Sequence, residues 1–369
     1  MDRLKTLVYT RLPGVTLAFI VATLGAVLFV AVDAPLPIFL GSLTACMIAS
    51  IVGLPLKRPR SLTIPTRMVL GVAIGSSFTP ALLDRAGELA ISLLLIAPYT
   101  AFVTALGYLF YRRIAGFDPA TSFFVSVPGG LTEMVFMSKE AGANERMVTL
   151  MQSVRLVLIV FAVPVVLSWT SDLPVRGAVL DTIHIWEVTA VDAAVMLAIA
   201  VIGWQIAAYF GILGASIVGP MIISGTVHAM GLTASQVPSE LLIVTQVTLG
   251  ILLGAQFRGL TLAEFTRWVS WALGYSVIII AFGLVVAAGI ARLTGADFTS
   301  VALAYAPGGQ SELSLLAIVL SLDVPFIALH HLLRVAVSIL GAQLVFSAQR
   351  VNWQTAATPG ASPSDKTPS

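Results

Sequence analysis

Two stretches of the chain, 118–155 and 297–334, carry the same ionisable and helix-breaking residues at a constant spacing of 179. Each has a Pro-Gly-Gly triplet, a glutamate shortly after it, and an arginine in the apolar run that follows. Carboxylates can take up a proton or a cation, and guanidinium groups can bind anions. We therefore expect a paired solute- or ion-binding site, and its candidate residues are Pro128, Gly129, Gly130, Thr132, Glu133, Gln152, Arg155, Pro307, Gly308, Gly309, Gln310, Ser311, Glu312, His331 and Arg334.

The two glutamates are predicted to lie in the first turn of a helix. Proline and glycine disfavour helix, so each triplet should break the segment, and a new helix should begin after it. Thr132 and Ser311 are then natural N-caps, and the positive end of the helix dipole stabilises Glu133 and Glu312. Each glutamate either only caps its helix or couples the site to protons or sodium ions.

Arg155 and Arg334 lie near the middle of long apolar segments. An arginine at the centre of a bilayer costs about 2.5–3.5 kcal/mol on insertion scales, so each should face the protein interior and find a partner there. Two interpretations stay open. Either Glu133 and Glu312 form ion pairs with the arginines and lock the structure, or the guanidinium groups and the helix ends attract an anionic solute.

The remaining polar residues of the repeat have predicted local roles. Gln152 and His331 precede the arginines by three residues and should line the same cavity. Four further residues stand before predicted helices and are expected to be N-caps: Asp118, Asn144, Asp297 and Asp323.

The sequence gives little support for metal or covalent chemistry. Cys46 is the single cysteine, which excludes an internal disulfide and a cysteine-based metal site. His330 and His331 are adjacent and point about 100° apart on a helix, so they cannot easily hold one metal ion. We expect no cofactor and no enzymatic activity.

The composition is that of a membrane protein. Of 369 residues, 58% are hydrophobic and 10% are charged, and the mean hydropathy is +0.98. Soluble domains carry about 25% charged residues, and a net charge of only +2 gives no basic field for nucleic acid. The partners expected are the lipid bilayer, a small solute and a coupling ion, with a homo-oligomer as a further option.

Twelve apolar segments divide six and six: 14–32, 36–54, 64–82, 88–111, 119–138, 145–170, 189–210, 213–231, 240–257, 267–291, 298–320 and 324–347. Glycine pairs at 71 and 75 and at 250 and 254 repeat in register, which predicts tight helix packing of the third segment in each half. The expected units are a first membrane repeat (1–172), an inter-repeat loop (173–188), a second membrane repeat (189–350) and a disordered tail (351–369).

The direction of the repeat depends on the broken segments. If they span the membrane, the halves are parallel; if they are re-entrant hairpins, each half crosses five times and the halves are inverted. The distribution of arginine and lysine over the loops favours the second arrangement. The predicted fold is an all-α polytopic membrane protein of inverted repeats, with ten spanning helices, two broken or re-entrant segments and both termini cytoplasmic.

The repeated pattern P-G-G-x-[ST]-E, followed by a helix with a central arginine, resembles the bacterial integral membrane AbrB family. Here it reads Pro128 to Glu133 with Arg155, and Pro307 to Glu312 with Arg334. Members of that family are labelled ammonia monooxygenases or AbrB-like regulators, and the resemblance implies the bacterial cytoplasmic (inner) membrane. Gln310 replaces an apolar residue found at the equivalent position of the first copy, so the two broken segments need not be equivalent.

Three functions remain in view. The leading hypothesis is a secondary transporter of a small, anionic solute coupled to H+ or Na+, with its site at the two breaks near the bilayer midplane. The alternatives are a membrane-embedded regulator or sensor and, with less support, a membrane monooxygenase, for which the metal ligands are missing.

Overall fold

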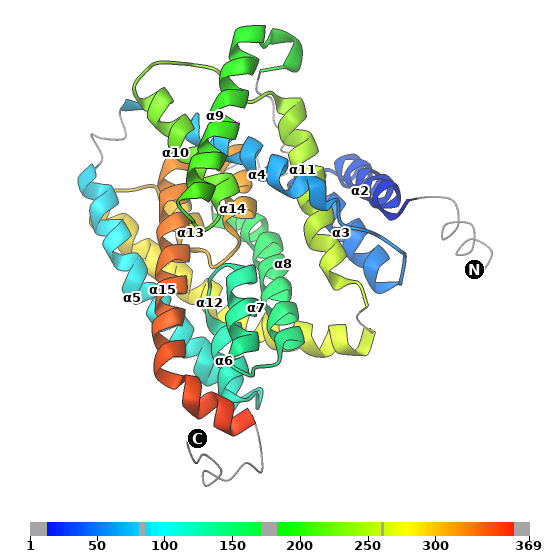
Figure 1. Cartoon of the computed structure of the whole chain (residues 1–369), viewed down its shortest axis with the longest axis vertical. Coiled ribbons are helices and arrows are strands. Elements are labelled where there is room, and N and C mark those ends of the chain that lie inside the picture. Colours follow the sequence, from blue (N-terminus) through cyan, green and yellow to red (C-terminus); the bar gives the residue numbers. More distant parts are fainter. Residues whose placement is uncertain (1–12, 81–85, 171–182, 260–261, 358–369) are drawn as a thin grey trace, which may run out of the picture.

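Figure 1 shows the computed structural model, which describes residues 13–80, 86–170, 183–259 and 262–357. Within these ranges the long regular elements are helices. The first half contains α2 (Gly14–Ala31), α3 (Pro37–Ile51), α4 (Arg60–Gly75), α5 (Ala86–Arg113), α6 (Pro119–Ser126), α7 (Leu131–Glu140) and α8 (Glu145–Thr170). The second half contains α9 (Ala190–Tyr209), α10 (Ala215–Ala229), α11 (Ser239–Gly254), α12 (Leu262–Thr294), α13 (Phe298–Tyr305), α14 (Gln310–Val319) and α15 (Val324–Ala357).

The same order of helices therefore occurs twice, as the duplication predicts. Short 3-10 turns, η2 (Ile185–Glu187) and η3 (Ala255–Phe257), precede α9 and extend α11. The fifth apolar segment of each half is divided into two short helices, α6 with α7 and α13 with α14, on either side of a Pro-Gly-Gly triplet. The predicted breaks are confirmed.

Within the described ranges, seven helices are long and apolar enough to cross a membrane: α2, α5, α8, α9, α11, α12 and α15. Outside the broken segments α3 and α10 have 15 residues each and α4 has 16, which is short of the roughly 20 that a full span needs. These seven long helices give the protein its helical membrane character, while the ten spanning helices stay a prediction.

The helices pack in two groups. α2, α3, α4, α9, α10 and α11 contact one another and form what we call the scaffold bundle. The remaining helices, α5 to α8 and α12 to α15, form what we call the hairpin bundle. The largest hydrophobic core extends from this bundle into α3, α4, α10 and α11 of the scaffold bundle. α4 packs against α14 and α15, and η3 against α8, which joins the two bundles. In Figure 1, α5 and α15 run side by side along the edge of the hairpin bundle, away from α2 and α3.

The repeated glycines bring the two halves together within the scaffold bundle. Gly71 and Gly75 of α4 lie against the backbone of α10, and Gly250 and Gly254 of α11 lie against α3. Tight packing of the third segment is confirmed, and its partner in each case is a helix of the other half. The contacts are reciprocal, because the third segment of each half packs against the second segment of the other.

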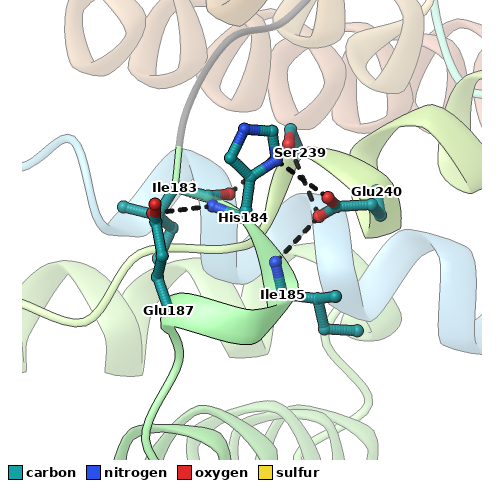
Figure 2. A network of polar contacts seen from close by, with 6 residues as sticks. All are labelled: Ile183, His184, Ile185, Glu187, Ser239 and Glu240. Atoms are coloured by element: carbon teal, nitrogen blue, oxygen red, sulfur yellow. Dashed lines mark hydrogen bonds and ion pairs between the residues drawn. The ribbon is translucent and has the colours of Figure 1, made fainter.

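A polar network fastens the segment that leads into α9 to the start of α11 (Figure 2). The Nδ1 atom of His184 lies 2.9 Å from Oε1 of Glu240, and the backbone N–H of Ile185 donates to Oε2 of Glu240 at 3.0 Å. Glu187 accepts from the backbone N–H of His184 at 3.0 Å. Of the predicted inter-repeat loop, only residues from 183 onward lie within the described structure.

The C-terminal end differs from the prediction. A disordered tail was expected from 351, but α15 continues to Ala357. Trp353 is buried, with its ring centroid 5.5 Å from that of Phe123 and 5.8 Å from that of Phe124. The prediction was wrong because it rested on the proline- and serine-rich composition of this region and overlooked Trp353, a single apolar residue within it. Residues beyond 357 and the basic residues before 13 lie outside the described structure.

Candidate functional site: two hairpins held by buried arginines

Both broken segments fold back on themselves as helical hairpins. The backbone N–H of Asn144, just after α7, donates to Oγ1 of Thr121 in the first turn of α6 at 2.9 Å. In the second half, the N–H of Asp323 donates to Oγ of Ser300 at 3.4 Å. The start of each first short helix thus lies beside the end of the second. Helices of 8 and 10 residues reach about 12 and 15 Å, which is roughly half the thickness of the hydrocarbon core of a bilayer.

The predicted N-caps at the hairpin bases are confirmed. Asp118 accepts from the N–H of Thr121 at 2.8 Å, and Asp297 accepts from the N–H of Ser300 at 2.7 Å. Asn144 and Asp323 cap the helices that follow, accepting from the backbone N–H groups of residues 147 and 326.

Arg155 holds the first hairpin by donating hydrogen bonds from its side chain to the backbone of the hairpin. The side chain is 5% exposed, and Nη1 donates to the carbonyl oxygens of Val125 and Ser126 at 3.0 and 3.3 Å. Its Nη2 donates to the carbonyl of Val127 at 3.3 Å and to Oε1 of Gln152 at 3.2 Å. These carbonyls belong to the end of α6 and the break, where a helix has no backbone donors left and its dipole favours a cation.

Arg334 holds the second hairpin in the same way. The side chain is fully buried. Its Nη1 donates to the carbonyl of Ala306, and its Nη2 donates to the carbonyl of Gly308 at 2.6 Å. A guanidinium suits this task because its fork of donors satisfies several carbonyls at once.

Gln152 and His331 support these two contacts from equivalent positions. Nε2 of Gln152 donates to the carbonyl of Phe124 at 2.7 Å, and Nε2 of His331 lies 3.0 Å from the carbonyl of Leu303, the residue equivalent to Phe124. Both side chains are buried. They lie beside the arginines and secure the ends of α6 and α13, while the cavity that they were expected to line together stays a prediction.

The two hairpin tips meet the same pair of helices. Ser338, one turn after Arg334 on α15, donates its hydroxyl to the carbonyl of Pro128 at 3.2 Å. Ile159, one turn after Arg155 on α8, lies 3.3 Å from where a Cβ would stand on Gly308. Each arginine helix therefore holds its own hairpin and touches the tip of the other.

The structure brings Ser338 and Ile159 to the tips, and sequence reasoning did not select them. Their spacing of four residues from each arginine was the available signal, because residues so spaced share a face of a helix. The two residues differ in kind, which concealed the equivalence. Gly129 lies at the first tip, where a Cβ would stand 3.3 Å from Cβ of Ser338.

The glutamates lie in the first turns of α7 and α14, as predicted, and each folds back toward the start of its own helix. A methyl group on Gly130 or Gly309 would collide with the carboxylate of Glu133 or Glu312 respectively. Glu312 is buried with 7% exposure, whereas Glu133 is half-buried. At these positions the positive end of each helix dipole stabilises the carboxylate.

The N-caps are Gly130 and Gly309 rather than the predicted Thr132 and Ser311. Both helices begin two residues earlier than expected, because glycine itself serves as a cap and leaves the next residues helical. Ser311 is half-buried, and the side chain of Thr132 lies outside the described structure. Nε2 of Gln310 is buried without a hydrogen-bond partner among the described residues.

The arginines therefore have carbonyl partners in place of the two expected ion pairs. In the described part of the chain, neither Glu133 nor Glu312 forms a salt bridge with an arginine. Arg334 and Arg155 lie near enough for their charges to interact, and Arg67 of α4 acts on Glu312 across the bundle boundary. Among the described residues, no group of histidine, cysteine and acidic side chains could hold a metal ion.

The comparison with known proteins agrees with the repeated motif. The family model described as "Transition state regulatory protein AbrB" matches residues 38–349. A protein of Bacillus subtilis (strain 168) named "Uncharacterized protein YhjN" is 29% identical over 73% of this chain and 73% of its own length. The "Putative regulator AbrB" of Escherichia coli (strain K12) is 24% identical over 83% of this chain and 88% of its own. With a match that includes both hairpins and both arginines, the chain belongs to the AbrB family.

Proposed function

We propose that this protein is a secondary transporter of a small solute, with the two hairpin tips at the centre of the pathway. The observation that carries the proposal is the reciprocal contact of the tips with α8 and α15. Broken backbone is tolerated at membrane depth only where protein or a water-filled cavity satisfies it. Paired half-helices that meet at the midplane are a recurrent arrangement in carriers.

The division into two bundles supports alternating access by relative motion. Between them, α4 packs against α14 and α15 and η3 packs against α8, and one hydrophobic core continues through both bundles. In this proposal the hairpin bundle moves against the scaffold bundle and carries both tips with it. α4, which carries Arg67, packs against α14, which carries Glu312, so the distance between these two charges would change during the motion.

Glu133 and Glu312 are the proposed coupling residues. Among the described residues neither forms a salt bridge with an arginine, and both lie at helix starts close to the tips. Binding of a proton or a sodium ion there would change the charge at the tips. The buried position of Glu312 makes it the stronger candidate, because a charge change in a low-dielectric region has the larger effect.

The expectation that the solute is an anion needs revision. The guanidinium Nη groups already donate to carbonyls, and the helix starts already face glutamates. The positive potential at the tips is thus largely compensated by carbonyl and carboxylate groups of the protein itself. We propose a pathway with no requirement for an anionic solute.

The proposed setting is the bacterial inner membrane. We place ten helices across the bilayer as inverted repeats, with both termini cytoplasmic, and assign no enzymatic activity and no cofactor. The hairpin bases support the inverted arrangement, because a re-entrant hairpin leaves an odd number of crossings in each half.

A flux assay in proteoliposomes tests the proposal. Uptake of a panel of radiolabelled carboxylates, amines and uncharged solutes would be measured with and without a proton or sodium gradient. We expect gradient-dependent uptake of at least one solute, lost in the Arg334→Lys variant, whose single ammonium cannot replace the fork. Absence of flux for every class under either gradient would contradict a transporter.

A regulatory role is the second candidate, favoured by the printed name of the Escherichia coli relative. A regulator would bind a partner protein without moving solute. Cross-linking of the partner in cells, together with absence of flux in the same assay, would favour it.

A further inference from the structure

A polar cleft of about 530 Å³ lies where the base of the first hairpin meets the end of α11. Oγ of Ser153 on α8 lies 2.5 Å from Oε1 of Gln256 in η3, so the hairpin bundle and the scaffold bundle touch next to the cleft. Its described lining comes from the α7–α8 junction and from the residues after η3: Asn144, Glu145, Arg146, Thr149, Leu150, Arg258 and Gly259.

Two arginines, one from each bundle, line this cleft. Arg258 has a single hydrogen bond among the described residues, from Nη1 to the carbonyl of Leu56 at 3.3 Å. A guanidinium has five N–H donors, so most of its fork is left for a ligand. Arg146 lies in the first turn of α8, where the positive end of the helix dipole favours an anion. Guanidinium groups beside a helix start are suited to bind phosphate.

The cleft is positively charged and open to a ligand. Glu145 is the one acid among its described lining residues, against two arginines. The side chains of Glu145, Arg146 and Arg258 are all exposed. An anion with several oxygens can therefore reach both guanidinium groups without any rearrangement of the protein.

The position of the two arginines along the chain corresponds to the level of the lipid headgroups. Arg258 directly follows the apolar span Ser239–Phe257, and Arg146 is the second residue of the apolar span Glu145–Leu167. In a bilayer the ends of such spans lie at the membrane surface, where the lipid phosphates are. Basic pockets between spanning helices bind the headgroups of anionic lipids.

We infer that this cleft binds the phosphate group of an anionic phospholipid between Arg146 and Arg258. A free phosphate ion would satisfy the same guanidinium groups, but a lipid also has acyl chains to place on apolar surface. α12 supplies such surface, because it packs against α8 and exposes Leu273 and Val277. A choline lipid would bring a positive group toward the two arginines. Bound in this way, one anionic lipid links the hairpin bundle to the scaffold bundle.

Glutamine substitutions remove the charges and keep polar side chains. Arg146→Gln and Arg258→Gln each change an exposed residue, so both variants are expected to fold. The matched control is Arg113→Gln. Arg113 is exposed at the end of α5, shortly before the first hairpin begins, and does not line the cleft. Glu145→Gln is the opposite test, because it removes the acid from the lining.

The experiment uses native mass spectrometry of the full chain in detergent micelles. The protein is titrated with phosphatidylglycerol or with phosphatidylcholine of the same acyl chains, and the affinity for the first bound lipid is measured. We expect phosphatidylglycerol to bind more tightly. Arg146→Gln and Arg258→Gln should each weaken its binding about fivefold or more, Arg113→Gln should leave it unchanged, and Glu145→Gln should strengthen it.

Equal affinity for the two lipids would overturn the inference. So would equal weakening by Arg113→Gln and by the two cleft variants, because it would show a general effect of surface charge. Inorganic phosphate in excess over the lipid is the third arm, and we expect it not to displace phosphatidylglycerol, since it lacks acyl chains. Displacement would assign the cleft to a free phosphate ion and overturn the lipid.

Discussion

Arg334 illustrates how an ionic side chain persists inside an apolar helix. Its guanidinium donates to the carbonyls of Ala306 and Gly308, which the break in the hairpin leaves without helical partners. Arg155 does the same for the first hairpin. The sequence predicted that each arginine faces the interior. It could not predict the acceptors, because the residue types do not show which backbone carbonyls lack a helical partner.

Removal of Arg334 should destabilise the hairpin bundle. Arg334→Ala leaves buried carbonyls without donors, and each unsatisfied group costs about 1–3 kcal/mol. We expect a lower apparent melting temperature in detergent and poor yield from membranes. Arg292→Ala is the control, because Arg292 is exposed at the end of α12. Equal melting temperatures for the two variants would contradict a holding role for Arg334.

Glu312→Gln addresses the coupling role. The amide preserves the size of the side chain and the helix start but cannot be ionised. We expect normal expression together with uptake that no longer depends on the proton or sodium gradient, measured in proteoliposomes. Glu133→Gln, at the half-buried equivalent, should have the smaller effect. Unchanged ion dependence in both variants would leave the glutamates as caps only.

At the level of elements, the hairpins depend on residues whose roles can be recognised from the sequence alone. Pro-Gly-Gly marks each break, and aspartates mark each base, so these features were predictable. The glycine caps were missed because serine is a better N-cap than glycine in isolation, and threonine is an equally good one. Tertiary context decided otherwise. The pairing of α4 with α10 and of α11 with α3 was also beyond prediction, because glycine spacing shows a close contact without showing its partner.

The glycines at these crossings should tolerate no side chain. Gly71→Ala would place a methyl group against the carbonyl of Ile217 on α10, and overpacking of this kind costs about 1–3 kcal/mol. Gly289→Ala, in open space, should instead gain about 1 kcal/mol from helix propensity. Thermal unfolding of both variants checks this. A stable Gly71→Ala protein would contradict the close approach of α4 and α10.

For the whole molecule, the repeated helix order and the reciprocal crossings describe two copies packed about a common axis. Duplication was evident in the sequence because charges, prolines and glycines are retained at one spacing. The orientation of the copies in a membrane was not evident, since loop charges favoured the inverted arrangement only slightly. The hairpin bases, held by Thr121 and Ser300, now add a geometric argument for it.

Labelling from the two sides of the membrane tests the orientation. Arg113 and Arg292 are equivalent, exposed and close to the ends of α5 and α12. In a Cys46→Ala background, Arg113→Cys and Arg292→Cys should react with a membrane-impermeant maleimide from opposite sides. The control is labelling after the membrane is opened, which should reach both. Reaction from the same side would indicate parallel repeats.

The meeting of the two tips between α8 and α15 is the central claim, and a disulfide tests it most directly. In a Cys46→Ala background, Gly129→Cys with Ser338→Cys would place the two Cβ atoms near 3.3 Å, close to the separation of about 3.5–4.5 Å found in disulfides. We predict a cross-link between the α6–α7 hairpin and α15 in membranes under mild oxidation, detected by mass spectrometry of the joined peptides. If both thiols react with maleimide but never with each other, the first tip does not lie against α15, and the shared site is contradicted.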